Sequence, residues 1–489
     1  MDALSYDAGL SYQRDEGYRK NSLSWSKNAN ASLSYDITGE DTLTFRFSGG
    51  ENYYQLPGPL TYEQYKKSPK KSSNRGDQDA HTDSGLITSL YEAERDWGKM
   101  QLNAGLNMRN IDWEMSGMHG WNQQRGYSLS PKIMYGDEDD YSISGGIDLL
   151  YDTLDFTGQN NVKINYAELN RLTTGPFLLA KKKFFDALTF SAGARYERAR
   201  TDGKNLQYNK ADMIEVLEPP YPWLDPIPNP DYPAQPIKEA SFDDSFYKEG
   251  WSYEAAILWE VTENFSLWCR YNRVYRYPAL DESASYQGYP LEHPLNAGLE
   301  PETGDNFEVG GKLRCGSWSG SATLFYLMMD DEISYDDQKK LNTNIGETER
   351  LGSDLQLAFE RDIYGASCMT ELVAAKFRDG ANKGEHVPLV PDAHGVVTLW
   401  VEPLADFRLT GNYTWVVTQY QGGDFSNKMR KIDGYGLFGV RADLTLMDHL
   451  GLFVKVDNLL DQAYASSAYT GAWYPGMGRA LYGGLTLEF

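Results

Sequence analysis

Aromatic and basic side chains in the polar stretches of this sequence have the chemistry of a ligand-binding surface. Tryptophan and tyrosine rings stack on planar groups and arginine donates several hydrogen bonds, so such side chains converge in binding pockets. The candidate ligand-binding residues, all expected in long loops, are Trp113, Trp121, Arg125, Tyr221, Trp223, Tyr286 and Tyr289. For any one of them, packing within a loop or a place in an aromatic girdle at a membrane surface is an equally good interpretation.

The sequence contains no residues spaced as in a catalytic or metal-binding motif. The serines lack a nucleophile-elbow motif, and the histidines lack the spacing of a metal site. The histidines are His81, His119, His293, His386, His394 and His449. We therefore expect no enzyme activity, no catalytic residues, no metal centre and no cofactor.

Two acidic runs and one basic cluster could each be a binding site or simply a solvated part of the surface. The acidic runs at 136–140 and 330–332 contain potential calcium ligands without the spacing of a calcium loop, which favours solvated turns or lumen charges. A basic cluster consists of Lys66, Lys67, Lys70, Lys71 and Arg75. It would suit contact with lipopolysaccharide phosphates, but a solvated loop is the favoured interpretation.

Composition excludes several classes of protein. The net charge of -24 argues against nucleic-acid binding, and no apolar run approaches the ~20 residues of a spanning helix. A mean hydropathy of -0.57 still suits a membrane protein made of strands, because only alternate residues of such strands face lipid. The 3 cysteines, Cys269, Cys315 and Cys368, imply no disulfide framework. Cys269 and Cys315 are expected on neighbouring strands, both on the apolar face.

Strands with strict alternation are the elements that must position the candidate residues. Leu188, Phe190 and Ala192 alternate with Thr189 and Ser191. The same pattern places Leu43, Leu106, Leu444 and Leu487 on a lipid-facing side. The opposite side carries Arg46, Arg109, Arg195, Glu197, Arg441 and Asp443. Unpaired charges are costly in a dry core, so this face should line a wet or plugged lumen.

Connections of two lengths alternate along the chain. Short links, such as Gly316 to Ser317, separate long ones. The long links are Tyr54 to His81, Met115 to Arg125, Thr153 to Asn161, Asp202 to Tyr247, Tyr277 to Glu302, Asp336 to Gly346, Asp379 to Pro391, Gln419 to Arg430 and Tyr464 to Gly478. Outer-membrane barrels have short periplasmic turns and long extracellular loops, so we expect a transmembrane antiparallel β-barrel of roughly 20 strands, with both termini periplasmic. The Pro-rich centre of the loop from Asp202 to Tyr247 cannot pair as a ladder.

The last nine residues, LYGGLTLEF, alternate to the final Phe489, which suggests that the end of the chain is structurally needed. This strand resembles the assembly signal of bacterial outer-membrane barrels. The stretches LNAGLEPETGDNFEVGGKL (295–313), YNRVYRYPALDE (271–282), VDNLLDQAY (456–464) and YPGMGRALYGGLTLEF (474–489) resemble the TonB-dependent outer-membrane receptors. The motif residues are Leu299, Pro301, Glu302, Thr303, Glu308, Gly310, Asn458, Tyr464, Gly478, Arg479 and Phe489.

This resemblance implies uptake of a scarce, bulky nutrient, such as a ferric siderophore or a cobalamin-like chelate, across the outer membrane of a Gram-negative bacterium. The implied partners are the TonB complex, the barrel assembly machinery at Phe489, membrane lipid and lipopolysaccharide, and a small chelate. Family members carry a plug domain and a barrel of about 22 strands. Residues 1–489 are expected to be the barrel domain alone, without plug, TonB box or signal peptide. A passive porin-like or structural barrel is the alternative.

Overall fold

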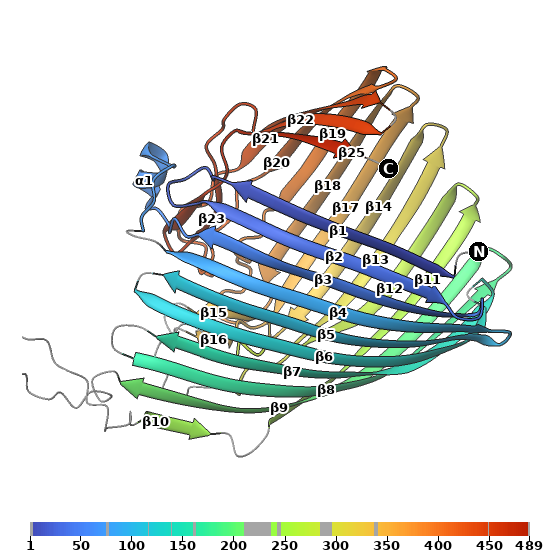
Figure 1. Ribbon diagram of the computed structural model, residues 1–489, viewed down its shortest axis with the longest axis horizontal. Helices are drawn as coiled ribbons and strands as arrows, with labels where there is room; N and C mark the ends of the chain where they lie inside the picture. The colour runs from blue at the N-terminus through green and yellow to red at the C-terminus, as the bar shows by residue number, and fades with distance from the viewer. Residues whose placement is uncertain are drawn as a thin grey trace, which may run out of the picture.

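The computed structural model describes residues 3–74, 78–115, 117–137, 139–159, 163–209, 236–241, 246–283, 296–336, 341–447 and 449–487. Its main element is a 21-stranded sheet whose neighbouring strands are antiparallel. Figure 1 shows this sheet curving round as a barrel wall. The expected all-β barrel class is therefore confirmed.

The first half of the wall contains the longest strands, β8 (Lys163–Phe184) and β9 (Leu188–Asn209). Its other strands are β1 (Leu4–Asp15), β2 (Ser24–Asp36), β3 (Asp41–Gln55), β4 (Asp79–Arg95), β5 (Gly98–Met115), β6 (Met118–Asp137), β7 (Tyr141–Gln159), β10 (Pro236–Ser241) and β11 (Phe246–Thr262). The short helix α1 (Tyr62–Lys67) lies between β3 and β4.

The second half contains β12 (Phe265–Arg276), β13 (Glu302–Cys315), β14 (Trp318–Asp330), β17 (Thr348–Arg361), β18 (Tyr364–Phe377), β19 (Ala393–Leu404), β20 (Phe407–Val416), β21 (Tyr435–Met447), β22 (Leu450–Asp457) and β25 (Ala480–Leu487). Two small hairpins stand outside the wall: β15 (Ile333–Asp336) with β16 (Leu341–Asn344), and β23 (Ala465–Tyr469) with β24 (Ala472–Pro475).

Strands of the wall pair in chain order, because most neighbours are joined as hairpins. The short β10 extends the ladder beside β9; without it, the 21 strands reduce to twenty, from β1 to β25. The expected number of strands is confirmed. Within the described ranges, β1 and β25 do not pair with each other, so the wall has a seam between these two edge strands. Both chain ends lie at the end of the sheet away from α1 (Figure 1). We call that end the turn end and the opposite one the loop end.

The strands β9 and β11 show an apolar face and a polar one, as the alternation predicted. In β9, Phe190 pairs across to Ile257 of β11, and Ser191 pairs to Ala256 on the other face. On the polar face, Arg195 contacts Asp148 of β7 and makes a 2.7 Å ion pair with Glu197. Arg441 and Asp443 form a similar pair at 2.6 Å. These arginines of the lumenal wall therefore have carboxylate partners within the wall itself.

The expectation of two long loops is wrong, because most of their residues belong to strands. The strands continue beyond the band of alternating apolar residues on the outer face, which we call the apolar belt. β6 begins at Met118, directly after the turn that contains Gly117, whose φ of 79° favours glycine. β7 likewise runs to Gln159, through most of the expected loop from Thr153 to Asn161. Backbone ladders do not require apolar side chains, so the sequence pattern marked the edge of the belt and not the end of the strand. The Pro-rich segment 210–235 lies outside the described residues.

Three of the other expected connections carry local structure in the described part of the chain. The link from Tyr54 to His81 contains α1, that from Asp336 to Gly346 contains part of the β15–β16 hairpin, and that from Tyr464 to Gly478 contains β23 and β24. Among the described residues, no helix combines the length and apolarity that a membrane-spanning helix requires. Cys269 and Cys315 lie on the neighbouring strands β12 and β13, as expected.

Nitroxide labels test the assignment of the two faces. In a Cys269/Cys315/Cys368→Ser background, labels at Leu106→Cys and Leu444→Cys should be reached by lipid-soluble oxygen, because these positions share the apolar face. Labels at Asn107→Cys and Asp443→Cys should be reached by a water-soluble nickel chelate. Electron paramagnetic resonance in liposomes measures both accessibilities, and the reverse result would show that the register is off by one residue.

Candidate ligand vestibule at the loop end

Three small apolar cores lie at the loop end of the barrel, where connections fold back against one another or against the lumenal wall. Each core consists of a few buried side chains, together with at least one residue from a segment distant in the sequence. A connection that merely crossed water would leave such side chains exposed. The cores therefore fix the connections around the mouth of the lumen, where a ligand would enter.

The first core lies on β7 and β8, where Leu154, Phe156, Ala167 and Leu169 are buried beneath Leu280. Arg171, on the same face of β8, is 8% exposed. Its Nη1 donates to the carbonyl of Pro278 at 2.6 Å, and its Nε donates to Thr201 Oγ1 at 3.0 Å. A buried guanidinium is costly without such partners, so Arg171 holds the start of the β12–β13 connection against the wall. Burial also raises the pKa of Tyr277, beside Pro278, to about 12.

The second core lies on the opposite wall. Ala375 and Phe377 of β18 are buried with Val387 of the next connection, and Ile345, Val390 and Phe425 pack around them. Two arginines bind the neighbouring loops to this wall through charge. Arg350 pairs with Glu332 at 2.7 Å. Arg378 pairs with both Asp330 and Glu347 at 2.8 Å.

The third core, which we call the clasp, consists of Leu60, Tyr65, Ile432, Ala465, Ala468 and Trp473. Leu60 and Trp473 exchange two backbone hydrogen bonds of 2.8 and 2.7 Å. The rings of Tyr65 and Trp473 stack 5.6 Å apart with an 8° angle between their planes. Thr61 begins α1 with a capping box to Gln64, which presents Tyr65 to the tryptophan.

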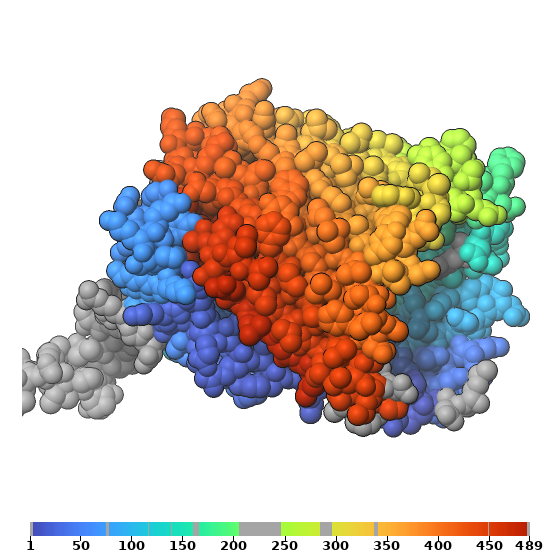
Figure 2. All heavy atoms as spheres, turned by 90° about the horizontal axis from the view of Figure 1, so that it is seen from above, coloured from blue at the N-terminus to red at the C-terminus, as the bar shows by residue number. Residues whose placement is uncertain are grey.

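The clasp joins the two sides of the seam. Leu60 and Tyr65 belong to the β3–β4 connection near one edge, whereas Ala465 and Trp473 belong to the β22–β25 connection at the other. Figure 2 shows the light-blue residues of the former against the red and orange residues near the carboxy-terminal edge. The clasp thereby packs together connections from the two sides of the seam, although β1 and β25 do not pair within the described ranges.

Basic residues of the expected cluster take part in this region. Lys66 makes a 3.0 Å ion pair with Asp433, and this hydrogen bond raises the pKa of Lys66. Lys70 lies 5.0 Å from the centre of the Tyr18 ring. Arg19 donates to the carbonyl of Lys71 at 2.8 Å. Lys66, Lys67, Lys70 and Lys71 are all exposed, and Lys66 and Lys70 also contact neighbouring connections; Arg75 lies outside the described residues.

Deeper in the lumen, a depression of about 400 Å³ opens on the wall formed by β8, β9, β11 and β12. Arg195, Glu254, Arg270 and Asn272 line it on the polar face. Arg270 and Glu254 form a 3.1 Å ion pair in which both side chains are substantially exposed. Such a surface offers hydrogen-bond donors and acceptors to a polar ligand or to a protein segment within the lumen.

The three candidate residues that the structure describes do not come together as one surface. Trp113 lies on the lumenal face of β5, 9% exposed, and a Cβ on Gly120 would come within 2.3 Å of its ring. Trp121 and Arg125, expected in a loop, lie in β6 on the same face as Tyr127 and point away from the lumen. These two residues lie in a strand and not in a loop because β6 begins as early as Met118. Tyr221, Trp223, Tyr286 and Tyr289 lie outside the described residues.

Asn122 is a residue that the sequence did not single out. Its side chain is 1% exposed on the lumenal face of β6, and its Oδ1 has no hydrogen-bond partner. The indole Nε1 of Trp113, on the neighbouring strand, is also buried without a partner. Unpartnered buried polar atoms are uncommon, so this donor and acceptor are candidates for contact with water or ligand. No signal in the sequence distinguishes Asn122 from other strand asparagines.

The motif residues around β13 organise the step from connection to strand. Leu299 is buried before the strand, and Pro301 precedes its first residue, Glu302. Glu302 accepts from Arg276 Nε at 2.6 Å and from the backbone of Ile333 at 2.8 Å. Thr303 pairs with Tyr275 across the ladder. Further down, Glu308 accepts from Asn306, and Gly310 makes room for the Trp268 ring.

The motif residues near the carboxy-terminus shape the last connection. Asn458, with φ of 48°, donates to the carbonyls of Gln462 and Met477 and accepts from the Gln462 amide. The ring of Tyr464 occupies the space above Gly476, and Tyr18 occupies that above Gly478. The Arg479 amide donates to Asp461 at 2.9 Å. Phe489 lies outside the described residues.

Comparisons with known proteins agree with this architecture. A family model described as TonB dependent receptor-like, beta-barrel matches residues 2–459. The ferric yersiniabactin uptake receptor of Yersinia pestis is similar with a TM-score of 0.78 and 13% identity, over 100% of this chain and 76% of that chain. The unliganded ferric citrate transporter is similar with a TM-score of 0.78 and 15% identity, over 100% and 74% of the two chains. A copper transporter is similar with a TM-score of 0.76 and 13% identity, over 99% and 76%.

Removing the central ring of the clasp tests its role at the seam. Trp473→Ala should loosen the connections on both sides, because replacing a buried tryptophan costs about 3–5 kcal/mol. Hydrogen exchange in residues 60–66 and 465–475 should quicken in the variant. Tyr469→Ala is the matched control, since Tyr469 lies in the same hairpin but is 49% exposed. Equal exchange in the two variants would show that the clasp does not hold these connections.

Proposed function

The chain belongs to the TonB-dependent receptor-like β-barrel family, and we propose that it captures a scarce, bulky nutrient at the cell surface and passes it inward with energy from TonB. The match over residues 2–459 is the observation that carries the proposal. This family is that of outer-membrane transport receptors, which are not enzymes. A ferric siderophore or a cobalamin-like chelate is the proposed class of substrate.

The loop end suits capture of such a substrate. In this proposal it is the extracellular end, and the three apolar cores hold its connections around the mouth instead of leaving them spread outward. Arg171 anchors one connection to the lumenal wall. The depression with Arg195 and Arg270 would then meet the polar or anionic groups of a chelate below the mouth.

The proposed partners follow from the same assignment. TonB would act through a plug domain, the barrel assembly machinery would recognise the carboxy-terminal strand, and the outer wall would contact lipid and lipopolysaccharide of a Gram-negative outer membrane. Residues 1–489 are proposed to be the barrel domain of the receptor.

Uptake measurements distinguish this receptor from a passive barrel. In iron-limited cells, uptake of radiolabelled ferric siderophores or cobalamin should require TonB and should saturate. Arg270→Ala should lower uptake several-fold without unfolding the protein, because an exposed ion pair contributes only about 0–1 kcal/mol to stability. Lys67→Ala, an exposed change on α1, is the control. Uptake that is unsaturable and independent of TonB would instead support the passive barrel.

The conductance of the 489-residue chain by itself is a separate expectation. A barrel of about 20 strands is too wide for inward side chains to fill, so in planar bilayers the purified chain should form a large, leaky pore. Arg171→Ala should increase the conductance or its fluctuations, because the connection after β12 loses its anchor. Negligible current in both proteins would mean that the connections seal the lumen unaided.

A further inference from the structure

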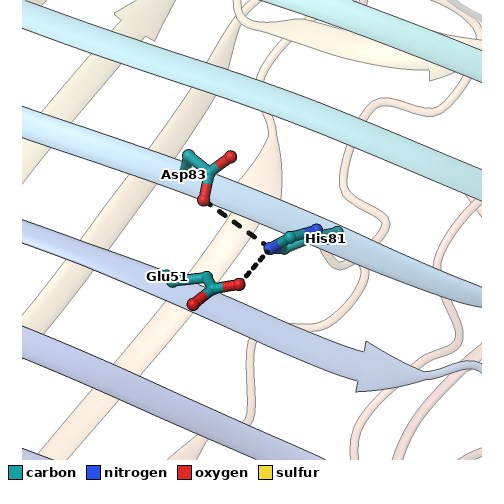
Figure 3. Close-up of side chains that lie close together, drawn as sticks. All are labelled: Glu51, His81 and Asp83. Carbon is teal, nitrogen blue, oxygen red and sulfur yellow. Dashed lines mark ion pairs between the residues drawn. The ribbon is translucent and has the colours of Figure 1, made fainter.

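Three potential metal ligands meet on the outer wall, away from the lumen and the vestibule. Glu51 of β3 and His81 and Asp83 of β4 place their ligand atoms within 4.8 Å of one another. Figure 3 shows the His81 ring nitrogen directed between the two carboxylates. The three residues occupy adjacent positions of the β3–β4 ladder, where Glu51 pairs with Asp83 and Tyr53 with His81.

These side chains lie on the outer face, above the apolar belt. Positions 45, 47, 49 and 51 of β3 share one face without a register shift, and Phe45 and Phe47 are its exposed apolar residues. At the level of Glu51 and beyond it toward the loop end, this face carries polar and amphipathic residues instead. Lys27 of β2 pairs with Glu51, and Trp25 of β2 pairs with Tyr53. Tryptophan and tyrosine are typical of membrane–water interfaces. The trio therefore stands at the level where the wall leaves the hydrocarbon.

The distances from His81 to the two carboxylates suit a small metal ion. The Nε2 atom of His81 lies 3.1 Å from Glu51 Oε1 and 3.6 Å from Asp83 Oδ1. Two ligand atoms that each lie about 2.0–2.2 Å from a tetrahedral ion are about 3.4 Å from each other. One of the two observed distances is slightly shorter than this separation and the other is slightly longer. The Nε2 atom of His81 is also buried and makes no hydrogen bond of good geometry. An ion between the three groups would give this nitrogen a partner.

Neighbouring side chains position the ligands. The Trp25 ring lies edge-on to the His81 ring with 6.1 Å between centroids, and it stacks on Tyr53 at 5.7 Å. Lys27 donates to Glu51 Oε2 at 2.9 Å, which leaves Oε1 directed at His81. Lys27 thus orients the carboxylate and also opposes a cation there by its charge.

We propose that Glu51, His81 and Asp83 bind a divalent transition-metal ion, with Zn²⁺ as the representative, on the outer wall. One imidazole and two carboxylates suit zinc or copper, whereas magnesium and calcium prefer oxygen ligands alone. Three protein ligands leave a fourth position open, and Asp83, which is 59% exposed, places that position at the surface. A bound ion would link β3 and β4 just outside the apolar belt. The site is distinct from the proposed nutrient pathway, and its test does not depend on that function.

Zinc titration of the full chain, refolded in detergent micelles without an affinity tag, tests this proposal. The Cys269/Cys315/Cys368→Ser background removes the thiols as competing ligands. We expect one site that is tighter than the rest. His81→Gln and Asp83→Asn should each weaken it about tenfold or more, by loss of a direct ligand. Co²⁺ in the same site should give visible d–d absorption that His81→Gln removes.

Two further variants separate a metal site from a network of ion pairs. Lys27→Met should tighten zinc binding severalfold, because it removes the cation that competes for Glu51. His394→Gln is the control, since His394 also faces a carboxylate, Glu371, at 3.8 Å, but on a distant part of the wall. Circular dichroism must show that every variant is folded. Zinc binding that is unchanged by both His81→Gln and Asp83→Asn would leave the trio as an ion-pair network only.

Discussion

The whole structure depends on the need to satisfy backbone hydrogen bonds in a medium without water. Within a bilayer, a strand must pair on both sides, so a sheet of this kind curves until its edges approach each other. In this chain the ladder runs without interruption from β1 to β25, and the two edge strands leave a seam. What joins the edges at the loop end is side-chain packing: the clasp places the Trp473 ring between connections that belong to opposite edges. The same end of the molecule therefore closes the wall and shapes the entrance.

The distribution of apolar and charged residues follows from the two environments of the wall. Outside, apolar residues face lipid at alternate positions. Inside, charged residues occur in pairs, such as Arg441 with Asp443, because a charge near a low-dielectric wall is stabilised by an opposite charge. The buried apolar cores are small and lie at the loop end. A barrel obtains its stability from the ladder and the lipid, and its apolar cores serve to fix the connections.

The family motifs prove to be architectural where the structure describes them. Glu302 joins β12 to the β15–β16 hairpin through Arg276 and Ile333, and Asn458 closes the turn after β22 through three hydrogen bonds. Neither residue faces the lumenal depression. Motifs of this kind identify the fold of a receptor barrel, whereas the substrate is selected by loop and lumen residues that carry no shared pattern.

The sequence by itself determined the all-β class, the number of strands, the two faces of the wall and the end at which both termini lie. These properties are local, because alternation with period two and the lengths of connections can be read along the chain. Only the tertiary structure decided where the ladders end, and so placed Trp121 and Arg125 on strand β6, facing outward. It alone joined Lys66 to Asp433, and Glu51 to His81 and Asp83. Backbone pairing is indifferent to side-chain polarity, and contacts between distant segments depend on the register and curvature of the wall, which no local pattern encodes.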